Sequence, residues 1–191
     1  MSLPCGRKIK RENETLVDDF LISMCEPVAT QLHETVSFMT PNILTTIGLL
    51  FGILAIIFLL KNMFLWSVVF LWICYWFDCL DGYYARKYKM ETQFGDYYDH
   101  FRDVFVVTVF IIILFLKLPS KFLFTSSILL VLYLMACQMG CQEKESTFKS
   151  ANKTLEVFGN MCPSPIFIRK SRIAGCSTLI MIITIFTLTL R

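Results

Sequence analysis

The chain has 191 residues, of which 55% are hydrophobic and only 17% are charged. A soluble domain of this size is typically about 45–50% apolar and about 25% charged, so this composition indicates an integral membrane protein and excludes intrinsic disorder, which requires low hydrophobicity and high net charge. The net charge of +3 is small and no basic stripe is present, so we expect no nucleic-acid partner.

The first 39 residues are expected to form a cytoplasmic N-terminal segment. Within it, residues 16–39 mix aliphatic and aromatic side chains with acidic ones such as Asp18 and Asp19. This pattern is typical of an amphipathic helix that lies on the membrane surface. We therefore divide the chain into residues 1–39, which carry this interfacial helix, and residues 40–191, which form a transmembrane domain.

Hydropathy predicts five membrane-spanning helices in the second part of the chain. Each apolar run is close to the roughly 20 residues that a helix needs to cross the hydrocarbon core, and none shows the alternation of a barrel strand. Thr40 can cap the first helix, and Pro41 suits its first position. The predicted spans cover residues 43–60, 63–77, 97–118, 122–139 and 173–190.

A sixth, weaker candidate covers residues 155–168. This stretch is short, and it contains Glu156, Pro163 and Pro165, so we expect it to be interfacial or re-entrant rather than a full span. The predicted fold is therefore an all-α integral membrane protein, a bundle of five to six transmembrane helices preceded by an amphipathic interfacial helix.

The basic residues predict the orientation of these helices. Lysine and arginine gather in residues 7–11, 86–89 and 144–172, and few lie at the other ends of the spans. The positive-inside rule then places the N-terminus and both basic loops in the cytoplasm. A multi-pass protein of this kind fits the endoplasmic reticulum of a eukaryote or the inner membrane of a bacterium.

The eight cysteines predict no disulfide framework. Five of them lie in or at the ends of apolar runs, and no CxxC pair is present. A zinc ribbon or a thioredoxin-type motif therefore has no support, and we expect buried thiols that act as small hydrophobic side chains.

Four aspartates flank the loop between the second and third predicted spans. Asp78 and Asp81 are three residues apart, and Asp99 and Asp103 are four apart, so each pair falls on one helical face. The predicted linker, residues 82–96, is short enough to fold the two helices side by side. All four carboxylates can then converge at one membrane depth, where ionisable groups are usually functional.

Four converging carboxylates with little local basic compensation would repel one another, and a divalent cation is the simplest remedy. Oxygen ligands alone suit Mg²⁺ or Mn²⁺, and two such ions could clamp a diphosphate. Arg86 could form paired hydrogen bonds with phosphate oxygens. Gly82 and Ala85 would let a planar group approach the helix backbone.

Two other interpretations of these carboxylates remain open. They could line the path of a divalent-cation carrier, or they could belong to a solvated loop that begins among the headgroups. The first, fourth and fifth predicted spans contain no acidic residue, which counts against a carrier.

The spacing of these residues resembles the signature of the CDP-alcohol phosphotransferase (CDP-alcohol phosphatidyltransferase) family, membrane enzymes of phospholipid synthesis. All eight fixed positions match, with every gap correct. The matched stretch reads Asp78-x2-Asp81-Gly82-x2-Ala85-Arg86-x8-Gly95-x3-Asp99-x3-Asp103. A second, weaker resemblance at the start of the first span reads Thr40-Pro41-Asn42-x2-Thr45-x2-Gly48.

The resemblance implies that a CDP-linked donor transfers its substituted phosphate to an acceptor hydroxyl and that CMP leaves. It implies that two ions, Mg²⁺ or Mn²⁺, are bridged by Asp78 and Asp99. Asp81 would bind the first ion only, and Asp103 would contact the second and act as general base. The implied substrate-binding residues are Asn42, Gly82, Ala85, Arg86, Thr92 and Gly95. The resemblance also implies a homodimer. A catalytically inactive member of the family that acts as a scaffold is a further possibility, and the intact set of four aspartates argues against it.

The resemblance leaves the donor and the acceptor open. His100 and Val104 stand where enzymes that use glycerol phosphate usually have Pro and Lys, which counts against that acceptor. Asp99-His100 is similar to the choline and ethanolamine transferases, whose acceptor is diacylglycerol, but those enzymes are typically about twice this length. The small size and Phe94-Gly95 are similar to enzymes that use CDP-diacylglycerol with inositol or serine, and we favour this reaction.

Four other polar residues have less specific expectations. His100 either assists catalysis or is a hydrogen-bonded neighbour of the site. Asp96 is expected to be a solvated loop acid. Arg102 either pairs with a site carboxylate or extends to the headgroups, and we favour the headgroups. His33 is expected to lie on the interfacial helix without a chemical role.

Overall fold

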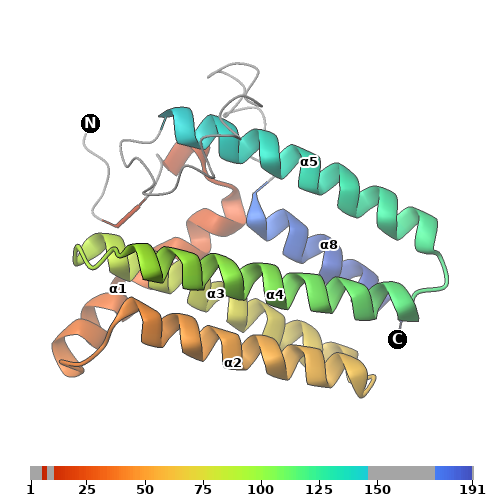
Figure 1. Cartoon of the computed structure of the whole chain (residues 1–191), viewed down its shortest axis with the longest axis horizontal. Coiled ribbons are helices and arrows are strands. Elements are labelled where there is room, and N and C mark those ends of the chain that lie inside the picture. The colour runs from red at the N-terminus through yellow and green to blue at the C-terminus, as the bar shows by residue number, and fades with distance from the viewer. Residues whose placement is uncertain (1–5, 8–10, 146–174, 191) are drawn as a thin grey trace.

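The structure is a computed structural model that describes residues 6–7, 11–145 and 175–190. Within these ranges the regular elements are all helical (Figure 1), as the sequence predicts. They are a 3-10 turn at Arg11–Asn13 followed by α1 (Leu16–Thr35), α2 (Pro41–Leu60), α3 (Phe64–Lys87), α4 (Gln93–Lys117), α5 (Lys121–Glu145) and α8 (Cys176–Leu188).

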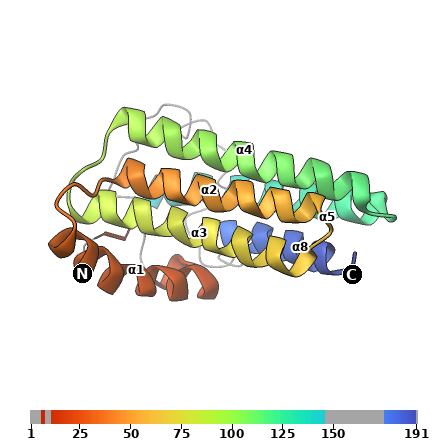
Figure 2. The same ribbon diagram turned by 90° about the horizontal axis from the view of Figure 1, so that it is seen from below.

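Helix α2 lies between α3 and α4 and packs against both (Figure 2). Their shared core contains the buried side chains of Leu71, Phe110 and Leu114, and α8 adds Ile183. A Cβ at Gly52 would lie 2.7 Å from Val106 Cγ2. Glycine at this position therefore lets α2 approach α4 closely.

The start of α2 follows the sequence prediction. Thr40 has an extended backbone, its side chain accepts a hydrogen bond from the backbone N–H of Ile43, and Pro41 is the first helical residue. Proline costs nothing here because its missing N–H has no partner in the first turn of a helix. This start fixes which residues of α2 face α3 and α4.

The connection between α3 and α4 is shorter than the sequence predicts. We expected the second span to end near residue 77 and a linker over residues 82–96, but α3 continues to Lys87 and α4 begins at Gln93. Three hydrophobic residues of the last turns of α3, namely Leu80, Tyr83 and Tyr84, are buried. Their packing extends the helix through a polar stretch that hydropathy does not recognise.

Helix α1 packs against the C-terminal half of α3. Cys25 and Ala29 are buried against Leu80 and Tyr84, and His33 donates to or accepts from the Tyr84 hydroxyl at 2.9 Å. On the outer side, Leu16, Phe20 and Met24 are exposed at the spacing of one helical face. A helix is thus present where we predicted one, and its position on the membrane surface stays a prediction.

Three of the predicted spans are confirmed as helices long and apolar enough to cross a membrane: α2, α3 and residues Lys121–Gln138 of α5. Helix α4 matches the third predicted span in position, but its first half carries the charged residues of the site. Helix α8 has 13 described residues. That α4 and α8 also cross the bilayer stays a prediction, and residues 155–168 lie outside the described ranges.

The cysteines follow the prediction only in part. Cys25, Cys74 and Cys137 are buried thiols. Cys141, at the end of α5, is disulfide-bonded, so the expectation of thiols alone is wrong for this residue. Cys141 lies beside Gln138, Gln142 and Glu143, and this sequence carries no signal for a disulfide. Cys176 is a thiol but is exposed, so the expectation of burial is wrong for it.

A buried acid near the start of α1 makes stability depend on pH. Glu14 is 6% exposed and forms an ion pair with Arg7, but burial outweighs this attraction and raises the pKa of Glu14 to about 7. The folded protein therefore holds a proton that the unfolded chain releases near its ordinary pKa of about 4.3. Its stabilising effect is complete below that pH and is lost as pH rises through about 7.

We expect the folded protein in detergent to lose about 2.5 kcal/mol more stability between pH 5 and pH 8 than the Glu14→Gln variant does. Glutamine keeps the shape of the protonated acid but does not titrate. Thermal unfolding of both proteins across this pH range measures the difference. Parallel profiles would contradict the assignment of the titration to Glu14.

Candidate functional site

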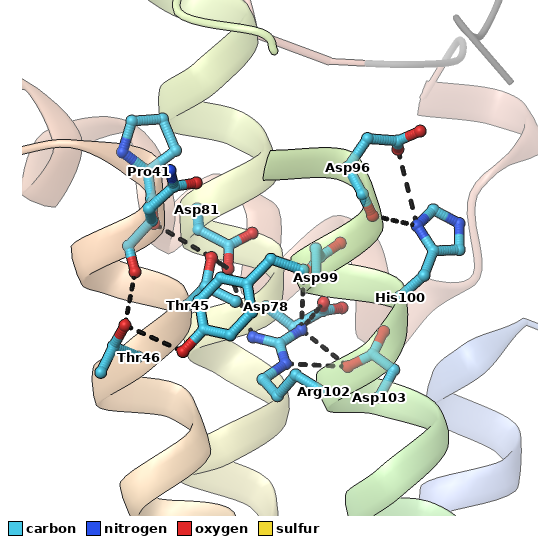
Figure 3. Close-up of polar contacts among 12 residues, drawn as sticks. Pro41, Thr45, Thr46, Asp78, Asp81, Asp96, Asp99, His100, Arg102 and Asp103 are labelled. Carbon is cyan, nitrogen blue, oxygen red and sulfur yellow. Dashed lines mark hydrogen bonds and ion pairs between the residues drawn. The ribbon is translucent and has the colours of Figure 1, made fainter. Parts of the chain in front are cut away.

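The four aspartates come together where α3 ends and α4 begins (Figure 3). Asp78 and Asp81 project from α3, and Asp99 and Asp103 project from α4. One carboxylate oxygen from each of Asp78, Asp99 and Asp103 lies within 4.8 Å of the other two. The structure thus brings the residues together as the spacing predicts.

Arg102 lies among these carboxylates with none of its side chain exposed. Its Nη2 atom donates to Asp99 Oδ1 and Asp103 Oδ1, both at 2.7 Å, and to Asp78. Its Nη1 atom donates to Asp81 Oδ2 at 3.2 Å. A single guanidinium therefore contacts all four acids.

This arrangement corrects two expectations. We favoured an Arg102 side chain that extends to the headgroups, but it is buried in the carboxylate cluster. The four acids were also expected to have little basic compensation, but a charge-assisted hydrogen bond reaches each of them. One signal in the sequence favoured pairing: Arg102 lies three residues after Asp99, on the same helical face.

Helix α2 supplies two positions that shape the cluster. The Thr45 hydroxyl donates to Asp81 Oδ2 at 2.7 Å and so fixes that buried carboxylate. A Cβ at Gly48 would lie 3.1 Å from Arg102 Nη1 and 3.1 Å from Phe77 Cβ, so glycine leaves room for the guanidinium. Both residues belong to the weaker of the two sequence resemblances, which assigned them no role.

A pocket of about 270 Å³ opens beside the cluster. This volume is just below the range of about 300–1,000 Å³ that is usual for small-molecule sites. Asp81 and Asp99 line both the pocket and the cluster. All six residues predicted to bind substrate also line the pocket: Asn42, Gly82, Ala85, Arg86, Thr92 and Gly95.

The first turn of α4 forms one wall of the pocket. Thr92 caps the helix, because its hydroxyl accepts a hydrogen bond from the N–H of Gly95 at 3.0 Å. A Cβ at Gly95 would lie 3.0 Å from both Asn42 Oδ1 and Thr92 Oγ1. Glycine at this position lets the start of α4 meet the start of α2.

Arg86 also lines the pocket, and the N-terminal segment orients it. Its Nε atom donates to the carbonyl oxygen of Gly6 at 2.8 Å. A Cβ at Gly82 would lie 3.1 Å from Arg86 Nη1, so the small residue one turn earlier leaves space for the guanidinium. The contact with Gly6 was not predicted, because nothing in the sequence pattern connects residues 80 positions apart.

The histidines and Asp96 differ in their relation to the site. The His100 side chain is half exposed, lies apart from the four carboxylates in Figure 3, and contacts the Asp96 carbonyl oxygen at 2.7 Å. Asp96 lines the pocket from the first turn of α4, so its assignment to a loop is wrong. His33 lies on α1, as expected, and stacks on Tyr88.

The carboxylate cluster fits a hard divalent cation. Its donors are all oxygen atoms, which Mg²⁺ and Mn²⁺ prefer, and the oxygens of Asp78, Asp99 and Asp103 are close enough to converge on one ion. Asp103 is the most exposed of the four, with 49% of its side chain accessible. Reactants can therefore reach the cluster both from the pocket and from the side of Asp103.

Comparison with known proteins gives a match to a family model. A family model described as CDP-alcohol phosphatidyltransferase matches residues 38–190, a range that includes the four aspartates and the pocket. No curated protein and no solved structure matches the chain.

Proposed function

The chain belongs to the CDP-alcohol phosphatidyltransferase family, and we propose that it transfers a phosphatidyl group from CDP-diacylglycerol to a small alcohol such as inositol or serine. Membership alone indicates a membrane transferase of phospholipid synthesis that uses a CDP-linked donor and an alcohol acceptor. The observation that supports the site is that the pocket and the carboxylate cluster share Asp81 and Asp99.

The donor is proposed to place its cytidine diphosphate in the pocket. Arg86 would bind phosphate oxygens through its Nη atoms, because its Nε is held by the Gly6 carbonyl and a guanidinium matches phosphate in geometry and charge. Gly82 and Ala85 would let the nucleotide lie against α3. Asn42, Thr92 and Gly95 would close the opposite wall.

The carboxylates are proposed to hold two divalent ions, Mg²⁺ or Mn²⁺. Asp78 and Asp99 would be shared between the ions, Asp81 would belong to the first, and Asp103 would belong to the second. When bound, the ions would neutralise the charge of the diphosphate and of the departing CMP.

Asp103 is proposed to act as the general base. Among the described residues it lies in the cluster but outside the lining of the pocket, so an acceptor hydroxyl can approach it opposite the nucleotide. The hydroxyl oxygen would attack the phosphorus atom that carries diacylglycerol, and its proton would pass to Asp103. The bond between that phosphorus and the bridging oxygen would break, and CMP would leave with the electron pair.

Membrane lipids are proposed to reach the site along α4. Phe101, Val104 and Phe105 are exposed beside Asp103, and they form an apolar surface that suits the acyl chains of a lipid substrate. The basic residues Arg86 and Lys87 lie in the last turn of α3, just after Asp78 and Asp81, and Lys89 follows them. We therefore propose that the site and the N-terminus face the cytoplasm, and that the protein acts as a homodimer.

A second reaction has specific support from one residue. His100 follows Asp99 as in the choline and ethanolamine transferases that this stretch resembles, and these enzymes transfer a phosphoalcohol to diacylglycerol. His100 is half exposed and contacts Asp96 rather than the four carboxylates (Figure 3), so the support for this reaction is the sequence resemblance at Asp99-His100. Both reactions release CMP, so they share one assay.

The test measures CMP release by purified protein with Mg²⁺ or Mn²⁺, and with EDTA as the control. One reaction contains CDP-diacylglycerol with inositol, serine or another small alcohol, and the other contains CDP-choline or CDP-ethanolamine with diacylglycerol. We expect metal-dependent release in the first. CMP release only in the second reaction would establish the choline or ethanolamine transferase activity. If folded protein releases no CMP in either reaction, the result would favour a divalent-cation carrier.

A further inference from the structure

The positively charged guanidinium of Arg102 lies at the centre of the carboxylate cluster. The Nη2 atom of Arg102 contacts Asp78, Asp99 and Asp103. These are the same three residues whose oxygens are close enough to converge on one ion. A nitrogen that contacts all three carboxylates lies where a metal ion would have to lie.

This cation cannot be neutralised by losing its proton. Arginine stays charged in proteins because its pKa is above about 12, and the Arg102 side chain has no exposed surface. Helix α2 makes room for this side chain, because Gly48 leaves the space that Nη1 occupies. The acids of the cluster are therefore compensated without any bound ion.

The same side chain has a second anchor outside the three carboxylates. Nη1 donates to Asp81 Oδ2 at 3.2 Å, and the Thr45 hydroxyl fixes that oxygen from the other side. The Nε atom of Arg102 also donates to Asp103 Oδ1, at 3.1 Å. Arg102 can thus release Asp78 and Asp99 through Nη2, and Asp103 through Nη2 and Nε, while it keeps a charged partner in Asp81. Such a partner matters because an unpaired buried charge is strongly destabilising.

We propose that Arg102 is an internal competitor for the metal site, so that a divalent ion binds the Asp78, Asp99 and Asp103 carboxylates only when Nη2 gives up its contacts with them. The inference rests on the proposed metal-dependent function. Arg102 stabilises the metal-free protein and weakens its affinity for the ion. The metal site is then occupied mainly under two conditions. Either the concentration of the free ion is high, or the concentration of a diphosphate that carries the ion is high.

The test compares Mn²⁺ binding by the wild-type protein and by Arg102→Met, measured by electron paramagnetic resonance of free Mn²⁺ in detergent. Methionine is unbranched and fills a similar space without the charge. We expect the Kd for Mn²⁺ to fall at least about tenfold in Arg102→Met, because one positive charge no longer competes. The matched control is Arg11→Met, which removes an exposed guanidinium that pairs with Asp19 and should leave the Kd unchanged.

Thermal unfolding supplies a second readout that does not depend on activity. In EDTA, Arg102→Met should unfold at least roughly 5 °C below wild type, and Mn²⁺ should raise its Tm by more than it raises that of wild type. If Arg102→Met does not fold without metal, Arg102→Lys, which keeps the charge but loses the planar guanidinium, is measured instead. Its Kd should also fall, since one ammonium cannot contact four carboxylates.

The outcomes separate this inference from the proposed function. Equal Mn²⁺ affinities in wild type and both Arg102 variants would overturn the inference while leaving a metal-dependent transferase intact. If the Arg102 variant binds Mn²⁺ more tightly than wild type but neither protein releases CMP, the inference is supported and the proposed reaction is not. Absence of Mn²⁺ binding in all of them would overturn both.

Discussion

The Asp103→Asn variant is expected to lose CMP release by a factor of about 10² to 10⁴, which is the usual contribution of a general base. Asparagine keeps an oxygen that can face the cluster but cannot accept the proton of the acceptor hydroxyl. The side chain of Asp103 is about half exposed, and its contacts in the described chain are with Arg102. The fold should therefore survive the change, and initial rates of CMP release measure the loss.

Two comparisons give this result its meaning. Glu34→Gln makes the same acid-to-amide change at an exposed position of α1 and should retain wild-type rates. A large loss in Asp103→Asn with an unchanged Tm assigns the defect to the chemistry. Full activity of Asp103→Asn would remove the assignment of Asp103 as the base, although the other three carboxylates could still bind metal.

The convergence of the aspartates was predictable because helical spacing is a local property. Asp78 and Asp81, like Asp99 and Asp103, share a face in any helix, and a short connection must keep the start of α4 close to the end of α3. The start of α2 at Pro41 was predictable for the same reason, since the Thr40 cap depends on a few adjacent residues. The six predicted binding residues were taken from the family resemblance rather than from local rules, and all of them line one pocket.

Contacts between distant segments were not predictable in this way. The burial of Arg102 depends on Gly48 of α2 and on Thr45, which holds Asp81, and no periodicity in α4 reports on these neighbours. The hydrogen bond from Arg86 to Gly6 joins segments 80 residues apart. Hydropathy also ended α3 too early, because buried Leu80 and Tyr84 stabilise a helical end that carries many polar residues.

The Arg86→Lys variant is expected to raise the KM for the CDP-linked donor by about 10- to 100-fold, with a smaller effect on kcat. Lysine keeps the positive charge, but it cannot pair with two phosphate oxygens and also reach the Gly6 carbonyl. A hydrogen bond to a charged group contributes roughly 1.5–3 kcal/mol, which corresponds to the expected change. CMP release at saturating acceptor and varied donor concentration separates KM from kcat.

The matched control for Arg86→Lys is Arg11→Lys, the same exchange at a side chain that is 66% exposed and pairs with Asp19. It should leave both kinetic constants unchanged. A loss confined to kcat in Arg86→Lys would indicate that Arg86 acts on the departing charge rather than on donor binding. An unchanged KM together with an unchanged kcat would contradict the placement of the diphosphate beside Gly82 and Arg86, and would move the donor to another part of the pocket.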